Sequence, residues 1–185
     1  MSRCPWATGD LLGDYHDREW GRPLRGRTAM FERMTLEAFQ SGLSWLIILR
    51  KRDAFRRAFA GFDIETVAGF SSRDVDRLLA DPGIVRNRAK IEATIANARV
   101  AADLATDLSD LLWSHAPEPR PRPATSADVP AQSPESVVLA RDLRRLGFRF
   151  VGPTTAYALM QATGMVDDHL RDCWVAGPFS RTGCR

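Results

Sequence analysis

Cysteine and long apolar runs are scarce in this sequence. It has only 3 cysteines in 185 residues, too few for a small secreted domain held together by disulfides. No apolar run reaches the roughly 18 residues of a membrane-spanning helix, and no secretory signal follows Met1. We therefore expect a cytoplasmic protein with no membrane partner, in which clustered cysteines favour a metal site over a disulfide.

Extremes of charge are also absent. With 44% hydrophobic and 26% charged residues, the composition is that of an ordinary globular protein. The net charge of +3 permits a polyanionic partner without requiring one. The length is typical of one domain or of two closely packed lobes.

Clean period-two alternation flanked by turn residues is missing too, so we expect an all-α fold. Capping residues and apolar spacing predict where the helices begin. The expected starts are Thr28, Ser44, Ser71, Asn87, Ser133 with Pro134, and Pro153. Residues 115–134 contain 6 of the 11 prolines, and we interpret them as an extended surface connection.

Cysteine and histidine occur in pairs at both ends of the chain. Cys4 and His16 lie near the start, and His169 and Cys173 lie near the end. The second pair is spaced i, i+4, which predicts that both side chains share one helical face. Thiolate and imidazole suit tetrahedral zinc, which would clip the termini together. A buried histidine and small cysteines packed in a core would give the same pattern.

The segment around Gly147–Gly152 has the pattern of helix, short turn and helix. Pro153 opens the second helix, whose free N–H groups could bind a phosphate. Arg144, Arg145 and Arg149 add positive charge beside it. This combination is typical of a motif that grips a DNA backbone without reading bases, although an ordinary helical hairpin with a solvated arginine face would look similar.

Aromatic residues gather near one carboxylate in the first 45 residues. They could sandwich a planar base, while the carboxylate binds its amine or a positive charge; a tryptophan-rich core is the alternative. The residues are Trp6, Tyr15, Trp20, Glu37 and Trp45.

A turn with an exposed leucine, at Gly42 and Leu43, could act as an apolar wedge in a base stack, though such leucines usually have no function. Asp167 and Asp168 precede His169. One of them could orient its imidazole, or both could simply begin a last helical turn.

Together these residues resemble the constitutive bacterial DNA-3-methyladenine glycosylase I family, often called Tag, of the helix-hairpin-helix glycosylase superfamily. The resemblance spans almost the whole chain, in the same order and spacing. The matching motifs are Arg3-Cys4-x-Trp6, Tyr15-His16-Asp17-x-Glu19-Trp20-Gly21, Gln40-x-Gly42-Leu43-Ser44-Trp45, Gly83-Ile84-x-Arg86-x-Arg88-x-Lys90-Ile91, Gly147-Phe148-x-Phe150-Val151-Gly152, Met160-Gln161-Ala162 and Asp168-His169.

The resemblance implies an all-α helix-hairpin-helix DNA glycosylase fold with a zinc site tying the termini. It implies a single domain, residues 1–185, of two helical lobes with the base pocket between them. The implied zinc ligands are Cys4, His16, His169 and Cys173. Four protein ligands leave no open position, so the zinc would be structural. Cys184 is not expected to bind.

The implied activity is base-excision repair by a monofunctional glycosylase, a monomer of the bacterial cytosol that acts on double-stranded DNA carrying alkylated bases. It would flip 3-methyladenine into the aromatic pocket and hydrolyse its N-glycosidic bond. Glu37, the base-recognising carboxylate, and Tyr15 are the expected catalytic residues. Trp6, Trp20 and Trp45 would bind the base. Because the methylated base is cationic, it leaves without a strong general acid.

The resemblance also assigns Gly42 and Leu43 to the turn that fills the gap left by the flipped nucleotide. The phosphate contacts are expected at Arg149, Val151, Gly152 and Thr154.

Two positions depart from the family pattern. Leu12 stands where relatives usually have an aromatic residue, which leaves one pocket contact open and could change the base preference. Asp167 stands where relatives often have asparagine, and a structural role is expected for it. The alternative from another class is a non-enzymatic, zinc-stapled module that binds damaged DNA on the same fold.

Overall fold

The computed structural model describes residues 2–175; the tail that carries Cys184 lies outside them. Within these residues the fold is all helical, as predicted, and the sole β-type contact is a bridge between Ser2 and Cys173. The α-helices are α1 (Gly9–Arg18), α2 (Arg27–Gln40), α3 (Trp45–Ala58), α4 (Ile64–Ala68), α5 (Ser72–Ala80), α6 (Arg88–Ala102), α7 (Leu108–Trp113), α8 (Pro134–Arg145) and α9 (Pro153–Ala162), with 3₁₀ turns η1 (Ala60–Phe62) and η2 (Ser126–Asp128). No helix in this part of the chain is both long and apolar enough to cross a membrane.

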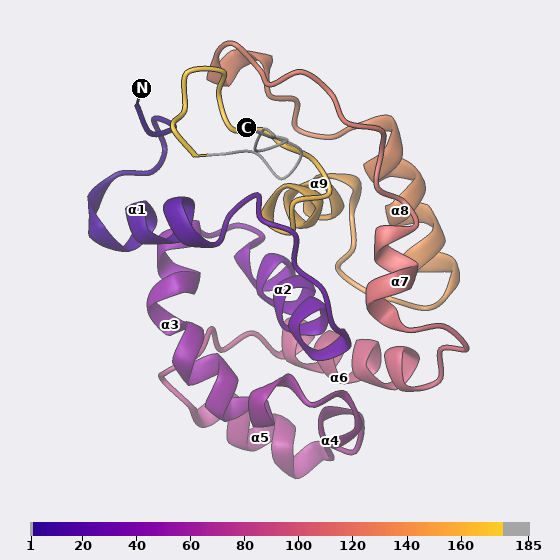
Figure 1. The fold of residues 1–185 in the computed structure, drawn as a ribbon. Coiled ribbons are helices and arrows are strands. Elements are labelled where there is room, and N and C mark those ends of the chain that lie inside the picture. The colour runs from indigo at the N-terminus through magenta and orange to yellow at the C-terminus, as the bar shows by residue number, and fades with distance from the viewer. Residues whose placement is uncertain (1, 176–185) are drawn as a thin grey trace.

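Helix α2 runs through the middle of the molecule (Figure 1). It contacts α3, α6, α7 and α9, and every residue from Arg33 to Phe39 is buried. A helix buried on all sides belongs at the centre of a fold. Its position determines where the charged residues Arg33 and Glu37 lie.

A cluster of phenylalanines forms the core between α2, α3 and η1. Phe39 and Phe55 meet edge to face with ring centroids 4.7 Å apart, and Phe59 stacks on Phe62 at 5.7 Å. Each buried ring stabilises the fold by about 1.5–3 kcal/mol. The same apolar core continues without a break to α6, α8 and α9.

Local capping explains most helix starts. Ser71 and Asp74 form a reciprocal capping box, and the side chains of Asn87 and Ser133 accept hydrogen bonds from the first turns of their helices. The predicted starts after Ser44, Ser71, Asn87 and Ser133, and at Pro153, are confirmed.

The predicted cap at Thr28 is wrong. Helix α2 begins earlier, at Arg27, after Gly26, whose φ of 96° is open to glycine. Three helices were not predicted, namely α1, α4 and α7, although the side chains of Asp63 and Asp107 cap the last two.

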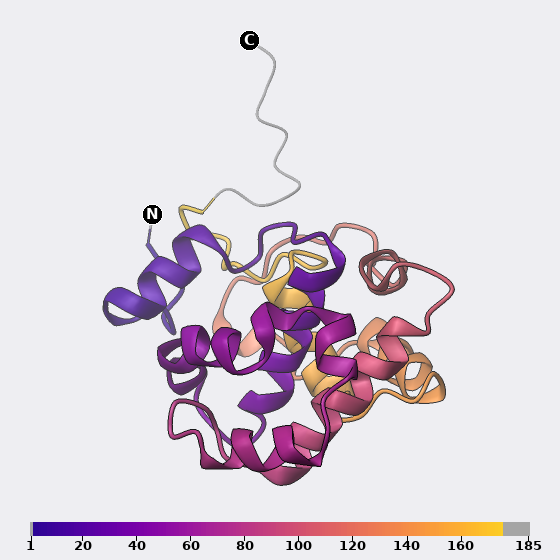
Figure 2. The same ribbon diagram turned by 90° about the horizontal axis from the view of Figure 1, so that it is seen from below.

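The expected helical turn at His169–Cys173 is also wrong. This segment is not helical, because its backbone forms hydrogen bonds with distant parts of the chain. The Ser2 amide donates to the Asp172 carbonyl at 3.1 Å and the Arg171 amide to the Pro123 carbonyl at 2.9 Å. Figures 1 and 2 both place the start of the chain beside this segment.

The chain makes a close backbone crossing at the end of α9. Gly164 has a φ of +74°, and a Cβ built on it would lie 2.7 Å from the Arg22 carbonyl carbon and 2.8 Å from the Pro23 nitrogen. The Leu24 amide donates to the Thr163 carbonyl at 3.0 Å in the same crossing. Position 164 therefore requires glycine for two reasons: its left-handed conformation and the lack of space for a Cβ.

We predict that Gly164→Ala destabilises the protein far more than Gly61→Ala. Both residues have a left-handed conformation, which costs an alanine about 1–2 kcal/mol. Only Gly164 faces a backbone clash, since nothing lies within 4 Å of a Cβ at Gly61. Overpacking adds about 1–3 kcal/mol. Urea unfolding of both variants measures the difference, and equal losses would contradict the role of the crossing.

Candidate active site and metal-ligating cluster

A cavity of about 460 Å³ opens between the N-terminal helices and α9. Its walls come from the first residues of the chain, α1, α2, α3, η2, α9 and the segment that follows α9. The lining residues are Cys4, Trp6, Tyr15, Trp20, Glu37, Gln40, Trp45, Ser126, Val129, Ala158, Gln161, Asp168 and Leu170. All five residues of the aromatic and acidic set from the sequence line this one cavity.

The aromatic walls are formed by two pairs of rings. Trp6 and Trp20 meet edge to face with centroids 5.0 Å apart, and Tyr15 and Trp45 are tilted at 5.4 Å. Tyr15 is buried, whereas Trp6 is 38% exposed at the rim. Such walls leave flat apolar faces between which a planar ring can stack.

Glu37 is the buried carboxylate of the cavity. It is 5% exposed, and none of the side-chain hydrogen bonds in the described residues ends on it. Burial raises the pKa of Glu37 to about 7, although the Arg33 charge opposes the rise. An unpartnered polar group in such a place is costly, so the site is built for a ligand that supplies the missing partner.

Arg33 is a candidate site residue that the sequence did not reveal. It lies one turn before Glu37 on α2 and is 7% exposed. It donates to the Tyr15 hydroxyl at 2.6 Å and lies 3.4 Å from Glu19, which also binds Arg52. Arg33 thus fixes the Tyr15 ring. No local pattern marked Arg33, because Tyr15 and Glu19 lie 18 and 14 residues earlier in the chain.

Two polar residues of the cavity lining were also missed as site residues. Asp168 accepts hydrogen bonds at 2.7 Å from both Tyr157 and Gln161. Gln161 and Asp168 lie within the quoted motifs, but only the folded chain places them in the same cavity as Glu37.

The proline-rich segment does more than connect two helices. Ser126 and Val129, from η2 and the residue that follows it, line the cavity. The prediction of a surface connection at residues 115–134 did not include this contribution to the cavity. Long-range contacts, which no local pattern encodes, fold this segment over the site.

The predicted wedge lies in an exposed turn between α2 and α3. Gly42 has a φ of +81° with open space around it, and Leu43 is 37% exposed. Buried Lys90 donates to the carbonyls of Phe39 and Ser41 at 2.9 and 2.6 Å. Lys90 therefore fixes the end of α2 from which this turn leaves.

The turn between α8 and α9 is held from inside by one side chain. Asn97 accepts from the Arg149 amide at 2.7 Å and donates to its carbonyl at 3.0 Å. The Arg149 side chain remains exposed. Val151 is 3% exposed, so of the predicted DNA contacts this one could involve only the backbone.

The first amides of α9 are available to a ligand. The Ala156 amide is the first to find a backbone acceptor, the Gly152 carbonyl at 2.8 Å. Within the described residues, no turn, loop or cap bond takes up the amides of Gly152 and Thr154. The guanidinium of Arg144 approaches Gly152, 3.6 Å from where a Cβ would stand.

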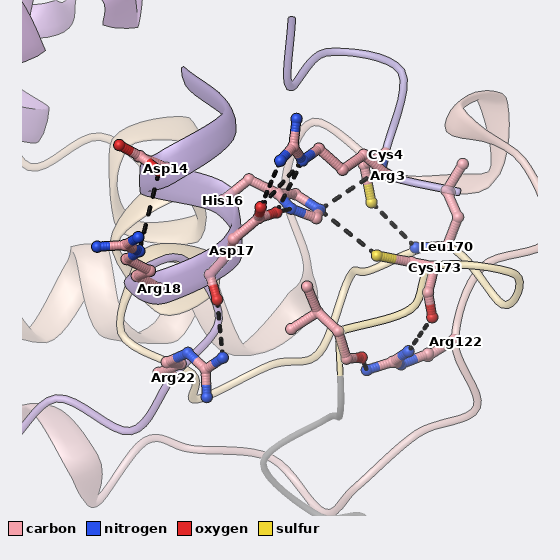
Figure 3. A network of polar contacts seen from close by, with 11 residues as sticks. Arg3, Cys4, Asp14, His16, Asp17, Arg18, Arg22, Arg122, Leu170 and Cys173 are labelled. Carbon is pink, nitrogen blue, oxygen red and sulfur yellow. Dashed lines mark hydrogen bonds and ion pairs between the residues drawn. The ribbon is translucent and has the colours of Figure 1, made fainter. Parts of the chain in front are cut away.

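Three of the four predicted metal ligands meet at the termini. The sulfur atoms of Cys4 and Cys173 and a nitrogen of His16 lie within 4.8 Å of one another, and all three residues are buried. The Cys173 Sγ is 3.5 Å from the His16 Nε2. Figure 3 shows both sulfur atoms facing the same space beside the His16 ring.

His169, the fourth predicted ligand, lies next to this group. Its ring centroid is 5.1 Å from that of His16, and its buried Nε2 has no hydrogen-bond partner in the part of the chain that the structure describes. Each histidine has its Nδ1 bound to a carboxylate, Asp17 at 2.8 Å and Asp167 at 2.9 Å. This arrangement is typical of metal-bound imidazoles, because it directs Nε2 at the cation. The donor types, two thiols and two imidazoles, suit zinc, and three of the four donors are brought together.

The structure shows where both departures from the family pattern lie. Asp167 bonds to His169 and to Arg122 and is not among the residues lining the cavity, which agrees with the structural role expected for it. Leu12 does not line the cavity either, so it supplies none of the wall.

Comparison with known proteins gives consistent matches. A methyladenine glycosylase family model matches residues 6–176. A DNA-3-methyladenine glycosylase of Haemophilus influenzae is 40% identical over 93% of this chain and 96% of its own length, and DNA-3-methyladenine glycosylase 1 of Escherichia coli is 40% identical over 94% and 96%. The structure of a variant 3-methyladenine DNA glycosylase I in complex with 3-methyladenine superposes with a TM-score of 0.89, at 35% identity over 95% of this chain and 97% of that one.

We predict that Glu37 makes the free protein less stable at high pH. Its folded pKa of about 7 lies above the ordinary value of 4.5. Its favourable contribution is therefore fully present below pH 4.5 and lost as the pH rises through 7. The total change is about 3 kcal/mol. Relative to the wild type, Glu37→Gln should gain that amount between pH 4.5 and 8.

Urea unfolding at several pH values measures this gain. Glu65→Gln, at an exposed site on α4, is the matched control and should follow the wild type. Parallel stability curves for wild type and Glu37→Gln would show that the Glu37 carboxyl is not strained by burial.

Proposed function

The chain belongs to the methyladenine glycosylase family, and we propose that it excises 3-methyladenine from alkylated double-stranded DNA by hydrolysing the N-glycosidic bond. The observation that carries this proposal is the buried carboxylate of Glu37, which lies in an aromatic cavity and has no side-chain hydrogen bond within residues 2–175. Relatives 40% identical over nearly the full chain are DNA-3-methyladenine glycosylases, and a solved relative binds the free base.

In this function the cavity receives the flipped base. Stacking on aromatic faces such as Trp45 and Tyr15 stabilises an extruded base by about 1–3 kcal/mol, which offsets the unstacking cost. Trp6 and Trp20 close the other side. The Glu37 carboxylate then accepts from the exocyclic amine and neutralises the positive charge of the methylated ring.

The chemistry follows from the charge of the substrate. The cationic base departs as a neutral molecule when the glycosidic electrons move onto its ring, so no strong acid is needed. The sugar becomes cationic and water attacks C1′. Glu37 selects the base and aligns it, while Arg33 holds the Tyr15 ring against it. Exclusion of water by the aromatic walls strengthens each of these contacts.

The turn between α8 and α9 is the proposed grip on DNA, as the hairpin of a helix-hairpin-helix motif. The free amides of Gly152 and Thr154 bind a phosphate at the positive end of the α9 dipole, with Arg149 beside it. Leu43, on its exposed turn, fills the space that the flipped nucleotide leaves. This grip is independent of sequence, because it involves phosphates only.

Zinc is the metal that we propose for the terminal cluster, held by Cys4, His16, His169 and Cys173. Bound there, it would supply a cross-link between the two ends of the chain. Four protein ligands leave no position for a substrate or water, so its contribution is to the folded state.

We predict that Glu37→Gln weakens the affinity for free 3-methyladenine by about 10- to 100-fold, because a hydrogen bond to a charged group contributes about 1.5–3 kcal/mol. Excision from alkylated DNA should slow as well. Calorimetric titration with the base and chromatography of the released bases measure the two effects. If Glu37 only satisfied protein donors, the variant would lose thermal stability and keep its base affinity.

Arg149→Glu is the contrasting variant. It should weaken binding to plain and alkylated duplexes equally, with a smaller salt dependence, and leave the affinity for free base unchanged. A loss confined to alkylated DNA would instead place Arg149 in base recognition.

We predict about one zinc per chain by elemental analysis. Cys173→Ser should lower the melting temperature more than it lowers the specific activity of the folded fraction, since the metal takes no part in the chemical step. A fully stable protein without metal would refute the proposed site.

A further inference from the structure

Each candidate metal-ligating histidine ends a chain of charged contacts. His16 Nδ1 binds Asp17, which accepts from Arg3 at 2.6 Å. His169 Nδ1 binds Asp167, which accepts from Arg122 at 2.8 Å. The first arginine adjoins Cys4 in the terminal segment itself and is half exposed, whereas Arg122 is 19% exposed and comes from the proline-rich segment.

Arg122 is anchored along the whole segment that carries the last two ligands. Besides Asp167 it donates to the Val175 carbonyl at 2.8 Å and to the Cys173 carbonyl at 3.4 Å, the latter drawn in Figure 3. The next residue, Pro123, accepts from the Arg171 amide at 2.9 Å. Charge-assisted bonds of this kind are about twice as strong as neutral ones.

The same segment forms a wall of the cavity only a few residues later. Ser126 and Val129 line the cavity, and Thr125 and Asp128 form a reciprocal capping box around η2. Pro123, which lies between Arg122 and these residues, limits the freedom of the backbone. The anchor at Arg122 therefore determines where this wall stands.

We propose that Arg122 is a positioning residue for base binding, which fastens the proline-rich wall of the cavity to the metal-ligating segment and so couples metal occupancy to the shape of the base site. The metal orders Asp167 through His169, and Asp167 holds Arg122. The inference rests on the proposed function for the identity of the base and of the metal.

Arg122→Met and Arg120→Met form a matched pair for the test. Arg120 belongs to the same segment and is 56% exposed, and it pairs with Glu135 on α8 rather than with the terminal segment. Hydrogen–deuterium exchange of the amides at 124–129 reports the wall directly. It is measured in the zinc-loaded proteins and after chelation, with peptides from α5 and α6 as the internal reference.

In the wild type and in Arg120→Met, chelation should raise exchange at 124–129 by about fivefold or more, a usual size for coupling between sites. In Arg122→Met the exchange should already be raised with zinc bound, and chelation should change it little. The same variant should bind free 3-methyladenine about fivefold more weakly, while Arg120→Met keeps the wild-type affinity.

Other outcomes would overturn the coupling. It fails if zinc-loaded Arg122→Met exchanges and binds base as Arg120→Met does, or if only its melting temperature falls. If chelation unfolds the whole protein, the comparison of zinc-loaded Arg122→Met with zinc-loaded Arg120→Met is the test of the coupling. A wild type that lacks affinity for 3-methyladenine but shows the expected exchange would refute the proposed function and leave the coupling in place.

Discussion

Burial of α2 from Arg33 to Phe39 is the constraint on which the site depends. Polar side chains in such a position usually find an internal partner. Arg33 finds Tyr15 and Glu19. Within residues 2–175 Glu37 finds no hydrogen-bond partner, and it lines the cavity instead. The core thus places an unsatisfied carboxylate where an amine-bearing cation can enter, and the stability lost there is recovered when the ligand binds.

The aromatic walls and the metal-ligating cluster form one packed body. Trp20 meets His169 edge to face at 4.7 Å, and Trp6 meets His16 at 5.3 Å. Gly21 contributes to this packing, because a Cβ there would lie 2.5 Å from the His169 ring. Rings that would sandwich a base on one side therefore rest on imidazoles on the other. Disorder of the chain termini would therefore disturb the aromatic walls directly, without any change in the apolar core.

The sequence predicts the local features of this structure, such as helix starts, but few of its long-range contacts. Three helix starts were predicted correctly because a cap involves only residues close together in the sequence. They are marked by Ser71 with Asp74, by Asn87, and by Ser133 with Pro134. His169 and Cys173 were expected on a helix, but their backbone pairs with the other end of the chain. The aromatic set and the four candidate metal ligands could be named in advance from residue types and from the family motifs, and three of those four lie together. Arg33, Arg122 and the wall at Ser126 could not, because their partners lie far away in the sequence.

The contact between Asn97 and the turn after α8 also bears on how this protein can evolve. Asn97 holds the backbone N–H and carbonyl of Arg149 and makes no demand on its side chain. Residue 149 can therefore change in size or charge while the loop keeps its shape, and natural variation can retune affinity for the nucleic-acid backbone there by single steps. Position 97 has no such freedom, since only an amide of that length both accepts from and donates to the backbone of that one residue. Selection can therefore act on the two residues separately: on residue 149 through the affinity for the nucleic-acid backbone, and on residue 97 through the shape of the loop.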